Sequence, residues 1–283
     1  MNKVEIVYDV EAPMRDGTVL RADTYMPAGE GPFPVILVRT PYDKRTWLGI
    51  DYSAIARAGY IVVVQDARGS FASEGEWLPW RHEREDGYDS VEWAAALPKS
   101  NGRVGMMGSS YLGSTQWSAA IAQAPHLVAI APWATWSDPE DGLMFRGGAI
   151  ELGLNGYWSM LTAIPRFFRD GLPPDQAIEK MVEGIESVDT IATDGYWGLP
   201  SGAPPMLERT GLPDLGVARA LKDRATTDDS RVATTIRRAD AALVEHLRLA
   251  RHLPPRGAGQ LHRHALTRQT GKAGCGTLGT PVV

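Results

Sequence analysis

Short apolar runs alternate with stretches of helical periodicity along the first half of the chain. The apolar runs predict strands at residues 4–10, 19–25, 35–38, 61–64, 104–107 and 127–131. Helices are predicted between them, at residues 53–58, 83–96 and 114–122. Asp16-Gly17 predicts a hairpin turn between the first two strands. The later strands alternate with helices, and this order predicts a mostly parallel sheet with helices on both faces.

The pattern changes after Trp133, where it becomes helical and rich in aromatic residues. This character continues to about residue 225 and predicts a helical insertion. In folds with parallel strands, catalytic groups gather beyond the carboxyl ends of the strands. Candidate catalytic residues are therefore expected in the segments that follow the predicted strands.

A glycine-bracketed serine follows the strand predicted at 104–107. Gly108 lies two residues before Ser110, Gly113 lies three residues after it, and a helix begins at once. Strand, turn and helix in this order are typical of a nucleophile elbow, a tight turn that presents a serine hydroxyl above the sheet. Leu112 occupies the place of the usual second glycine. The alternative is a Gly/Ser-rich turn that only connects core elements.

Three further sets of residues follow the strands. If Ser110 is the nucleophile, the backbone N–H of Tyr111 would face the developing oxyanion. Tyr42, after the strand at 35–38, could add its phenol O–H, although a packed loop tyrosine is the simpler interpretation. Asp66 and Arg68 are predicted to form a structural ion pair at the rim of the site. The histidines before the C-terminal segment, His82 and His126, follow no late strand and are predicted to be surface or core residues.

Composition indicates a soluble globular protein. The 283 residues are 43% hydrophobic and 22% charged, and no apolar run approaches the length of a membrane span. The N-terminal residues show no secretory pattern, and Cys275 has no second cysteine to pair with. We therefore expect a cytoplasmic protein.

Linked motifs at residues 38–44, 65–75 and 105–113 resemble the CocE/NonD family, the serine hydrolases that include cocaine esterase, α-amino-acid ester hydrolases and X-Pro dipeptidyl-peptidases. Residues 14–17 and 129–132 share this resemblance. It implies an α/β-hydrolase fold with a helical cap insertion. It also implies that Ser110 is the nucleophile, and that the Tyr42 O–H and the Tyr111 N–H form the oxyanion hole. Trp158 would line the acyl pocket, and the alternative is a tryptophan of the cap core.

The same resemblance implies the partners of the protein. Its substrate would be a small-molecule ester or amide or a short peptide, hydrolysed through an acyl-serine without a metal or organic cofactor. No nucleic-acid or membrane partner is expected. The choice between esterase and peptidase stays open, because it depends on the cap pocket and on carboxylates that would bind a substrate amine.

The C-terminal segment departs from the family pattern. The family's aspartate and histidine motifs, its final strands and its C-terminal β-sandwich domain are not found in the printed sequence. Every Trp, Tyr and Phe lies at or before Trp197. Residues 1–215 carry 17 Lys and Arg against 29 Asp and Glu, whereas residues 216–283 carry 12 against 5. A basic segment without aromatic residues is typical of a disordered arm.

A shifted reading frame offers another explanation. Read one base later, the codons of residues 249–254 are compatible with the peptide WHDIYL, those of 260–264 with NFTAM, and those of 276–280 with GPWGH. These peptides match the missing aspartate and histidine motifs in the family's order. Our hypothesis is that the frame slips near residue 230, and nucleotide sequencing decides it.

The resulting division of the chain is the N-terminal part of an α/β-hydrolase core at 1–137, a helical cap at 138–228, and an aberrant, disordered tail at 229–283. Without the aspartate and histidine we expect this chain to be inactive or weakly active. The alternative is a non-catalytic hydrolase scaffold whose basic tail binds a partner.

Overall fold

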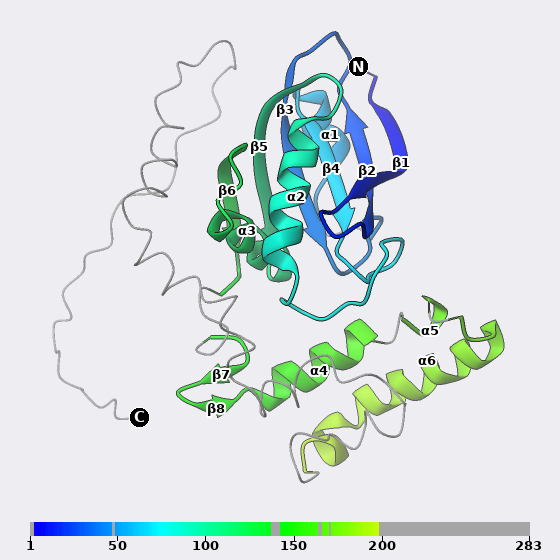
Figure 1. Cartoon of the computed structure of the whole chain (residues 1–283). Helices are drawn as coiled ribbons and strands as arrows, with labels where there is room; N and C mark the ends of the chain where they lie inside the picture. Colours follow the sequence, from blue (N-terminus) through cyan, green and yellow to red (C-terminus); the bar gives the residue numbers. More distant parts are fainter. Residues whose placement is uncertain (1–2, 47–48, 137–141, 164–165, 170, 198–283) are drawn as a thin grey trace, which may run out of the picture. The chain divides into compact units, whose positions relative to one another are not determined.

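The computed structural model describes residues 3–46, 49–136, 142–163, 166–169 and 171–197 (Figure 1). Six strands form one sheet in the order β1-β2-β4-β3-β5-β6. Their bounds are β1 Glu5–Pro13, β2 Val19–Met26, β3 Phe33–Thr40, β4 Ile61–Asp66, β5 Ser100–Ser109 and β6 Leu127–Trp133. β2 runs antiparallel to both β1 and β4, whereas β4, β3, β5 and β6 run parallel to one another. The predicted mostly parallel sheet is confirmed.

Helices cover both faces of this sheet. They are α1 Tyr52–Arg57, α2 Glu83–Ala95 and α3 Tyr111–Ile121, and α2 and α3 lie in front of the sheet in Figure 1 while α1 lies behind it. Successive side chains of a strand point to opposite faces, so the apolar runs of β3 and β4 supply both cores. Val35 and Leu37 pack on the side of α2 and α3, and Val38 packs on the side of α1.

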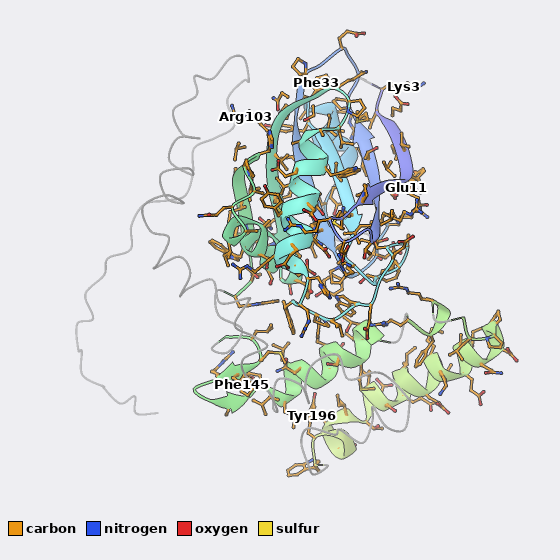
Figure 2. The ribbon with its side chains drawn as sticks, in the orientation of Figure 1. Lys3, Glu11, Phe33, Arg103, Phe145 and Tyr196 are labelled. Carbon is orange, nitrogen blue, oxygen red and sulfur yellow. The ribbon has the colours of Figure 1, made fainter. Side chains whose placement is uncertain are left out.

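The parallel strands end at one edge of the sheet. Figure 2 shows Phe33 and Arg103, from the beginnings of β3 and β5, at the opposite end. Thr40 pairs with Asp66, and Ser109 pairs with Trp133, so the loops that follow β3, β4, β5 and β6 all leave from the same edge. The candidate residues predicted from the sequence follow these four strands.

The segment after β6 is mainly helical, as predicted. It contains a short hairpin, β7 Phe145–Arg146 and β8 Ala149–Ile150, and then α4 Leu152–Ala163, α5 Arg166–Arg169, α6 Pro174–Asp189 and the π-helix η1 Ile191–Gly195. Within the described ranges, no helix is both long and apolar enough to cross a bilayer. The predicted end of the cap at 228 and the predicted tail at 229–283 lie outside the described residues.

Candidate active site

Ser110 lies at the tight turn between β5 and α3. Its φ is 55° and its ψ is −122°, in a region that non-glycine residues rarely adopt. The Ser110 N–H donates to the carbonyl of Trp133 at 3.1 Å, and the Thr135 hydroxyl donates to the Ser110 carbonyl at 2.8 Å. A backbone in this conformation persists only where its surroundings hold it, and such positions cluster at functional sites. The geometry is that of a nucleophile elbow.

Glycines are required on both sides of this turn. Gly108 has a φ of +145°, and a Cβ there would lie 2.4 Å from the Cβ of Leu112. A Cβ at Gly113 would lie 2.6 Å from the Cβ of Thr135. The first glycine lets the strand approach α3, and the second lets α3 approach the segment after β6.

The Gly113→Ala variant is expected to be less stable by about 1–3 kcal/mol, the usual cost of forcing extra volume into a packed site. Urea unfolding followed by circular dichroism measures the loss. Gly153→Ala is the matched control, because the nearest atom to its added Cβ is the Tyr196 hydroxyl at 3.8 Å. Equal stability of the two variants would contradict the proposed crowding.

Gln116 ties the turn to β6. Its side-chain amide donates to the carbonyls of Gly108 and Leu112 at 3.1 and 2.9 Å. Its carbonyl oxygen accepts the N–H of Ala131 at 2.9 Å. The side chain is fully buried, so these hydrogen bonds satisfy its polar atoms and fix the position of the elbow against the neighbouring strand.

The side chain of Tyr42 reaches Ser110 from the loop after β3. The indole N–H of Trp158 donates to the Tyr42 hydroxyl at 3.1 Å. Burial raises the pKa of the Tyr42 phenol above its ordinary value, while the interactions of its hydroxyl with Trp158 and with the Ser110 side chain act in the opposite direction. The phenol therefore stays protonated at neutral pH and can donate a hydrogen bond.

Tyr111 is the first residue of α3, where backbone N–H groups have no partner within the helix. Its side chain is fully buried. The Tyr111 hydroxyl donates to a Glu83 carboxylate oxygen at 2.9 Å and accepts the N–H of Trp80 at 3.0 Å. Burial, followed by the charge of Glu83, raises the pKa of this phenol well above its ordinary value. The side chain anchors the residue whose N–H adjoins Ser110.

A pocket of about 280 Å³ adjoins Ser110. The described residues that line it are aromatic and apolar apart from a few polar groups: Trp80, Ser110, Ala134, Thr135, Trp136, Gly142, Leu143, Leu154, Asn155 and Trp158. Trp158 stacks on Trp80 with ring centroids 5.5 Å apart, and on Tyr111 at 6.2 Å. Such a concave apolar site beside a nucleophile can hold the acyl part of a substrate.

Buried ion pairs lie beneath this site. Arg39, whose side chain has no exposed surface, donates to Glu83 at 2.6 Å and to the side-chain oxygen of Gln65 at 2.9 Å. Glu83 also accepts the Tyr111 hydroxyl, so a chain of polar contacts links β3 to the first residue of α3.

The predicted pair between Asp66 and Arg68 is wrong. The Arg68 guanidinium binds Asp86 at 2.5 Å and Asp16 at 2.7 Å, whereas Asp66 binds the ammonium of Lys44 at 2.9 Å. The two side chains are two positions apart at the end of β4, and each finds its partner on a different element. Sequence proximity suggested a pair that this backbone does not form.

Neither histidine of the described residues lines the pocket at Ser110. His126 pairs with Glu92 at 2.7 Å on an exposed surface. His82 immediately precedes α2.

Sequence reasoning missed most of the pocket. Trp80, Trp136 and Asn155 were not singled out, and the Trp158 indole was expected to line the pocket but not to bind Tyr42. The concentration of aromatic residues before Trp197 was the available signal, but it did not show which rings would meet. Gln116 gave no signal, because a glutamine inside an apolar helix is compatible with many roles.

Comparisons with known proteins agree with this geometry. The X-Pro dipeptidyl-peptidase (S15 family) profile matches residues 16–210. Cocaine esterase from Rhodococcus sp. (strain MB1 Bresler) is 40% identical over 215 residues, which are 68% of this chain and 36% of that protein. The chain thus spans about a third of the length of this relative.

Solved structures show the same fold. A CocE/NonD family hydrolase from Staphylococcus aureus is 32% identical and has a TM-score of 0.53, over 56% of this chain and 32% of that one. An α-amino acid ester hydrolase has a TM-score of 0.56 over 84% of this chain and 41% of that one. It is 22% identical, so this similarity concerns the fold alone.

A mostly parallel sheet with a serine at the elbow after β5 defines the α/β-hydrolase class. Within that class, the chain belongs to the X-Pro dipeptidyl-peptidase (S15) family, together with the CocE/NonD hydrolases.

Proposed function

We propose that this chain carries the nucleophile and the oxyanion hole of a serine hydrolase that cleaves acyl esters or amides through an acyl-serine. One observation carries the proposal: Ser110 is held at a φ of 55°, beside the first N–H of α3, and its side chain interacts with that of Tyr42. Family membership supports the same chemistry, because the relatives are named as an esterase, a peptidase family and hydrolases.

The reaction would proceed in two steps. The Ser110 oxygen attacks the substrate carbonyl, its proton passes to a general base, and the Tyr42 O–H and the Tyr111 N–H stabilise the oxyanion. The leaving group takes a proton and departs, and water then hydrolyses the acyl-serine. A serine hydroxyl is a weak nucleophile without a base. We propose that the general base, a histidine, and its aspartate are encoded in the reading frame shifted by one base near residue 230. The printed chain lacks both, so it would be weakly active or inactive.

An ester is the preferred substrate class. A peptidase that recognises a free amino terminus needs a carboxylate for the substrate ammonium, and none of the described residues that line the Ser110 pocket is acidic; residues 137–141 lie outside the described ranges. Aromatic walls and a volume of about 280 Å³ suit an apolar acyl group. The similarity to a protein named cocaine esterase points the same way.

Hydrolysis of p-nitrophenyl acetate and of Gly-Pro-p-nitroanilide tests the proposal. Both the printed chain and the chain translated one base later from near residue 230 are assayed. We expect the longer chain to hydrolyse the ester, and the printed chain to reach only a small fraction of that rate. A longer chain that folds and hydrolyses neither substrate would refute the proposal. Steeply salt-dependent binding of the printed chain to a polyanion would instead favour a non-catalytic scaffold with a binding arm.

Tyr42→Phe, which removes only the phenol oxygen, is expected to lower kcat for the ester by roughly 10²–10³, the usual loss for one oxyanion donor. KM should change little, because the bond to the oxyanion forms in the transition state. Tyr25→Phe, also a loss of one phenol oxygen but on β2, is the matched control. A kcat that is equal in the two variants would exclude Tyr42 from the oxyanion hole.

A further inference from the structure

Tyr42, the proposed oxyanion donor, lies in the loop that follows β3. Its backbone N–H donates to the Thr40 hydroxyl oxygen at 3.0 Å. The next residue, Asp43, has a φ of 77°, in the left-handed region that residues other than glycine rarely adopt. Such a conformation persists only where the surrounding structure imposes it. Lys44, the residue that follows, makes contacts that can impose it here.

One carboxylate holds Lys44 at both its backbone and its side chain. Lys44 is 3% exposed, and Asp66 has no exposed surface. The Lys44 N–H donates to Oδ1 of Asp66 at 2.7 Å, and the Lys44 ammonium donates to Oδ2 at 2.9 Å. Hydrogen bonds to a charged group are among the stronger ones in proteins. Together the two bonds fix both the position and the direction of the chain at Lys44.

Asp66 belongs to the sheet and is itself held in place. It is the last residue of β4, and its Oδ2 also accepts the N–H of Ala72 at 3.2 Å. The Lys44 ammonium reaches a second strand as well, because it contacts Oδ1 of Asp9 on β1 at 2.8 Å. The loop after β3 is therefore tied to two strands at a point two residues from Tyr42.

The position of the Tyr42 phenol is critical for the proposed reaction. A donor stabilises an oxyanion only if it lies within hydrogen-bonding distance of the place where that oxygen forms. A displacement of about 1 Å can lower a rate roughly 100-fold. The phenol oxygen already accepts the Trp158 indole N–H at 3.1 Å and interacts with the Ser110 side chain. Small movements of the loop would disturb both contacts.

From these contacts we infer that the buried ion pair of Lys44 and Asp66 positions the Tyr42 phenol for the oxyanion. Neither side chain of the pair touches the substrate in this account. Both act through Tyr42, so they are positioning residues and not catalytic ones. The inference rests on the proposed function, because it gives the pair a role in the oxyanion hole.

Kinetics in two backgrounds test the inference in the longer chain read one base later. Lys44→Met removes the ammonium and keeps a side chain of similar length. We expect it to lower kcat for p-nitrophenyl acetate by roughly 10–100-fold, less than Tyr42→Phe does, with little change in KM. Added to Tyr42→Phe, it should lower kcat no further, because the donor that it positions is already gone. Lys99→Met, the same change at an exposed lysine just before β5, should leave kcat unchanged.

A spectroscopic measurement does not require activity. The Trp158 indole N–H donates to the Tyr42 oxygen, so its amine proton resonance reports where that oxygen lies. The printed chain is labelled with ¹⁵N-tryptophan, and Trp158→Phe assigns the resonance. Lys44→Met should shift this resonance toward its position in Tyr42→Phe, whereas Lys99→Met should leave it in place.

A double variant guards against a failure to fold. Lys44→Met leaves the Asp66 carboxylate buried without its ammonium partner, which is strongly destabilising. Lys44→Met/Asp66→Asn removes both charges of the pair, and the same kinetic and spectroscopic results are expected for it.

Two results would overturn the inference. One is an equal fractional loss of kcat with and without Tyr42→Phe, and the other is a Trp158 resonance that loss of the pair does not move. The pair would then have a structural role only. If Tyr42→Phe itself leaves kcat unchanged, the proposed oxyanion hole is wrong, and the resonance alone decides whether the pair positions the phenol.

Discussion

Ser110→Ala is expected to lower kcat for p-nitrophenyl acetate by about 10⁴–10⁶ in the longer chain read one base later, because removal of a triad nucleophile costs this much in serine hydrolases. In the printed chain the same substitution should change the rate far less. If the printed chain has no general base, as proposed, its Ser110 is not activated, and any remaining catalysis would come from the proposed oxyanion hole and from binding.

Stopped-flow and steady-state assays of four proteins measure this difference: each chain length with serine and with alanine at position 110. Ser109→Ala is the matched control, since it removes a neighbouring hydroxyl at the end of β5. If the printed chain already shows turnover that alanine at position 110 abolishes, a base is present in it. Our interpretation of the C-terminal segment would then be wrong.

Arg39→Met should destabilise the protein by about 3–5 kcal/mol, the cost of leaving a buried charge without its partner. Arg39 is fully buried and binds Glu83 at 2.6 Å, and its second terminal nitrogen lies 3.9 Å from Asp86. Methionine has a similar length but supplies no donor. Glu83 would lose its counter-charge, and the Tyr111 hydroxyl that donates to it would be displaced.

Urea unfolding of Arg39→Met measures this loss. Arg57→Met is the control, because Arg57 binds Asp51 at 3.3 Å on the surface and such pairs contribute about 0–1 kcal/mol. The double variant Arg39→Met/Glu83→Gln should recover part of the stability, since a neutral amide tolerates burial better than a carboxylate. Equal losses for Arg39→Met and Arg57→Met would show that the buried pair has no special role.

The sheet was predictable because its signals are local. A buried strand such as β4 is a continuous apolar run, and the elbow at Ser110 has glycines where side chains would collide. The strand order places β4, β3 and β5 side by side, so the candidate residues that follow them lie at the same edge of the sheet. This order was not predicted from the sequence.

Contacts between distant segments could not be predicted. Trp158 lies 116 residues after Tyr42, and nothing in either segment marks their hydrogen bond. The same reason explains the wrong pair at Asp66 and Arg68. A charged side chain selects its partner by position in space, and here Asp86 and Lys44 are nearer than the neighbour in sequence.

The positive φ of Ser110 limits how this scaffold can be re-engineered. Threonine would keep a hydroxyl, but its branched Cβ is disfavoured at a φ of 55°. Cysteine has an unbranched Cβ like that of serine. Directed evolution toward another nucleophile can therefore explore thiol chemistry at this turn, whereas a threonine nucleophile would first require a different backbone.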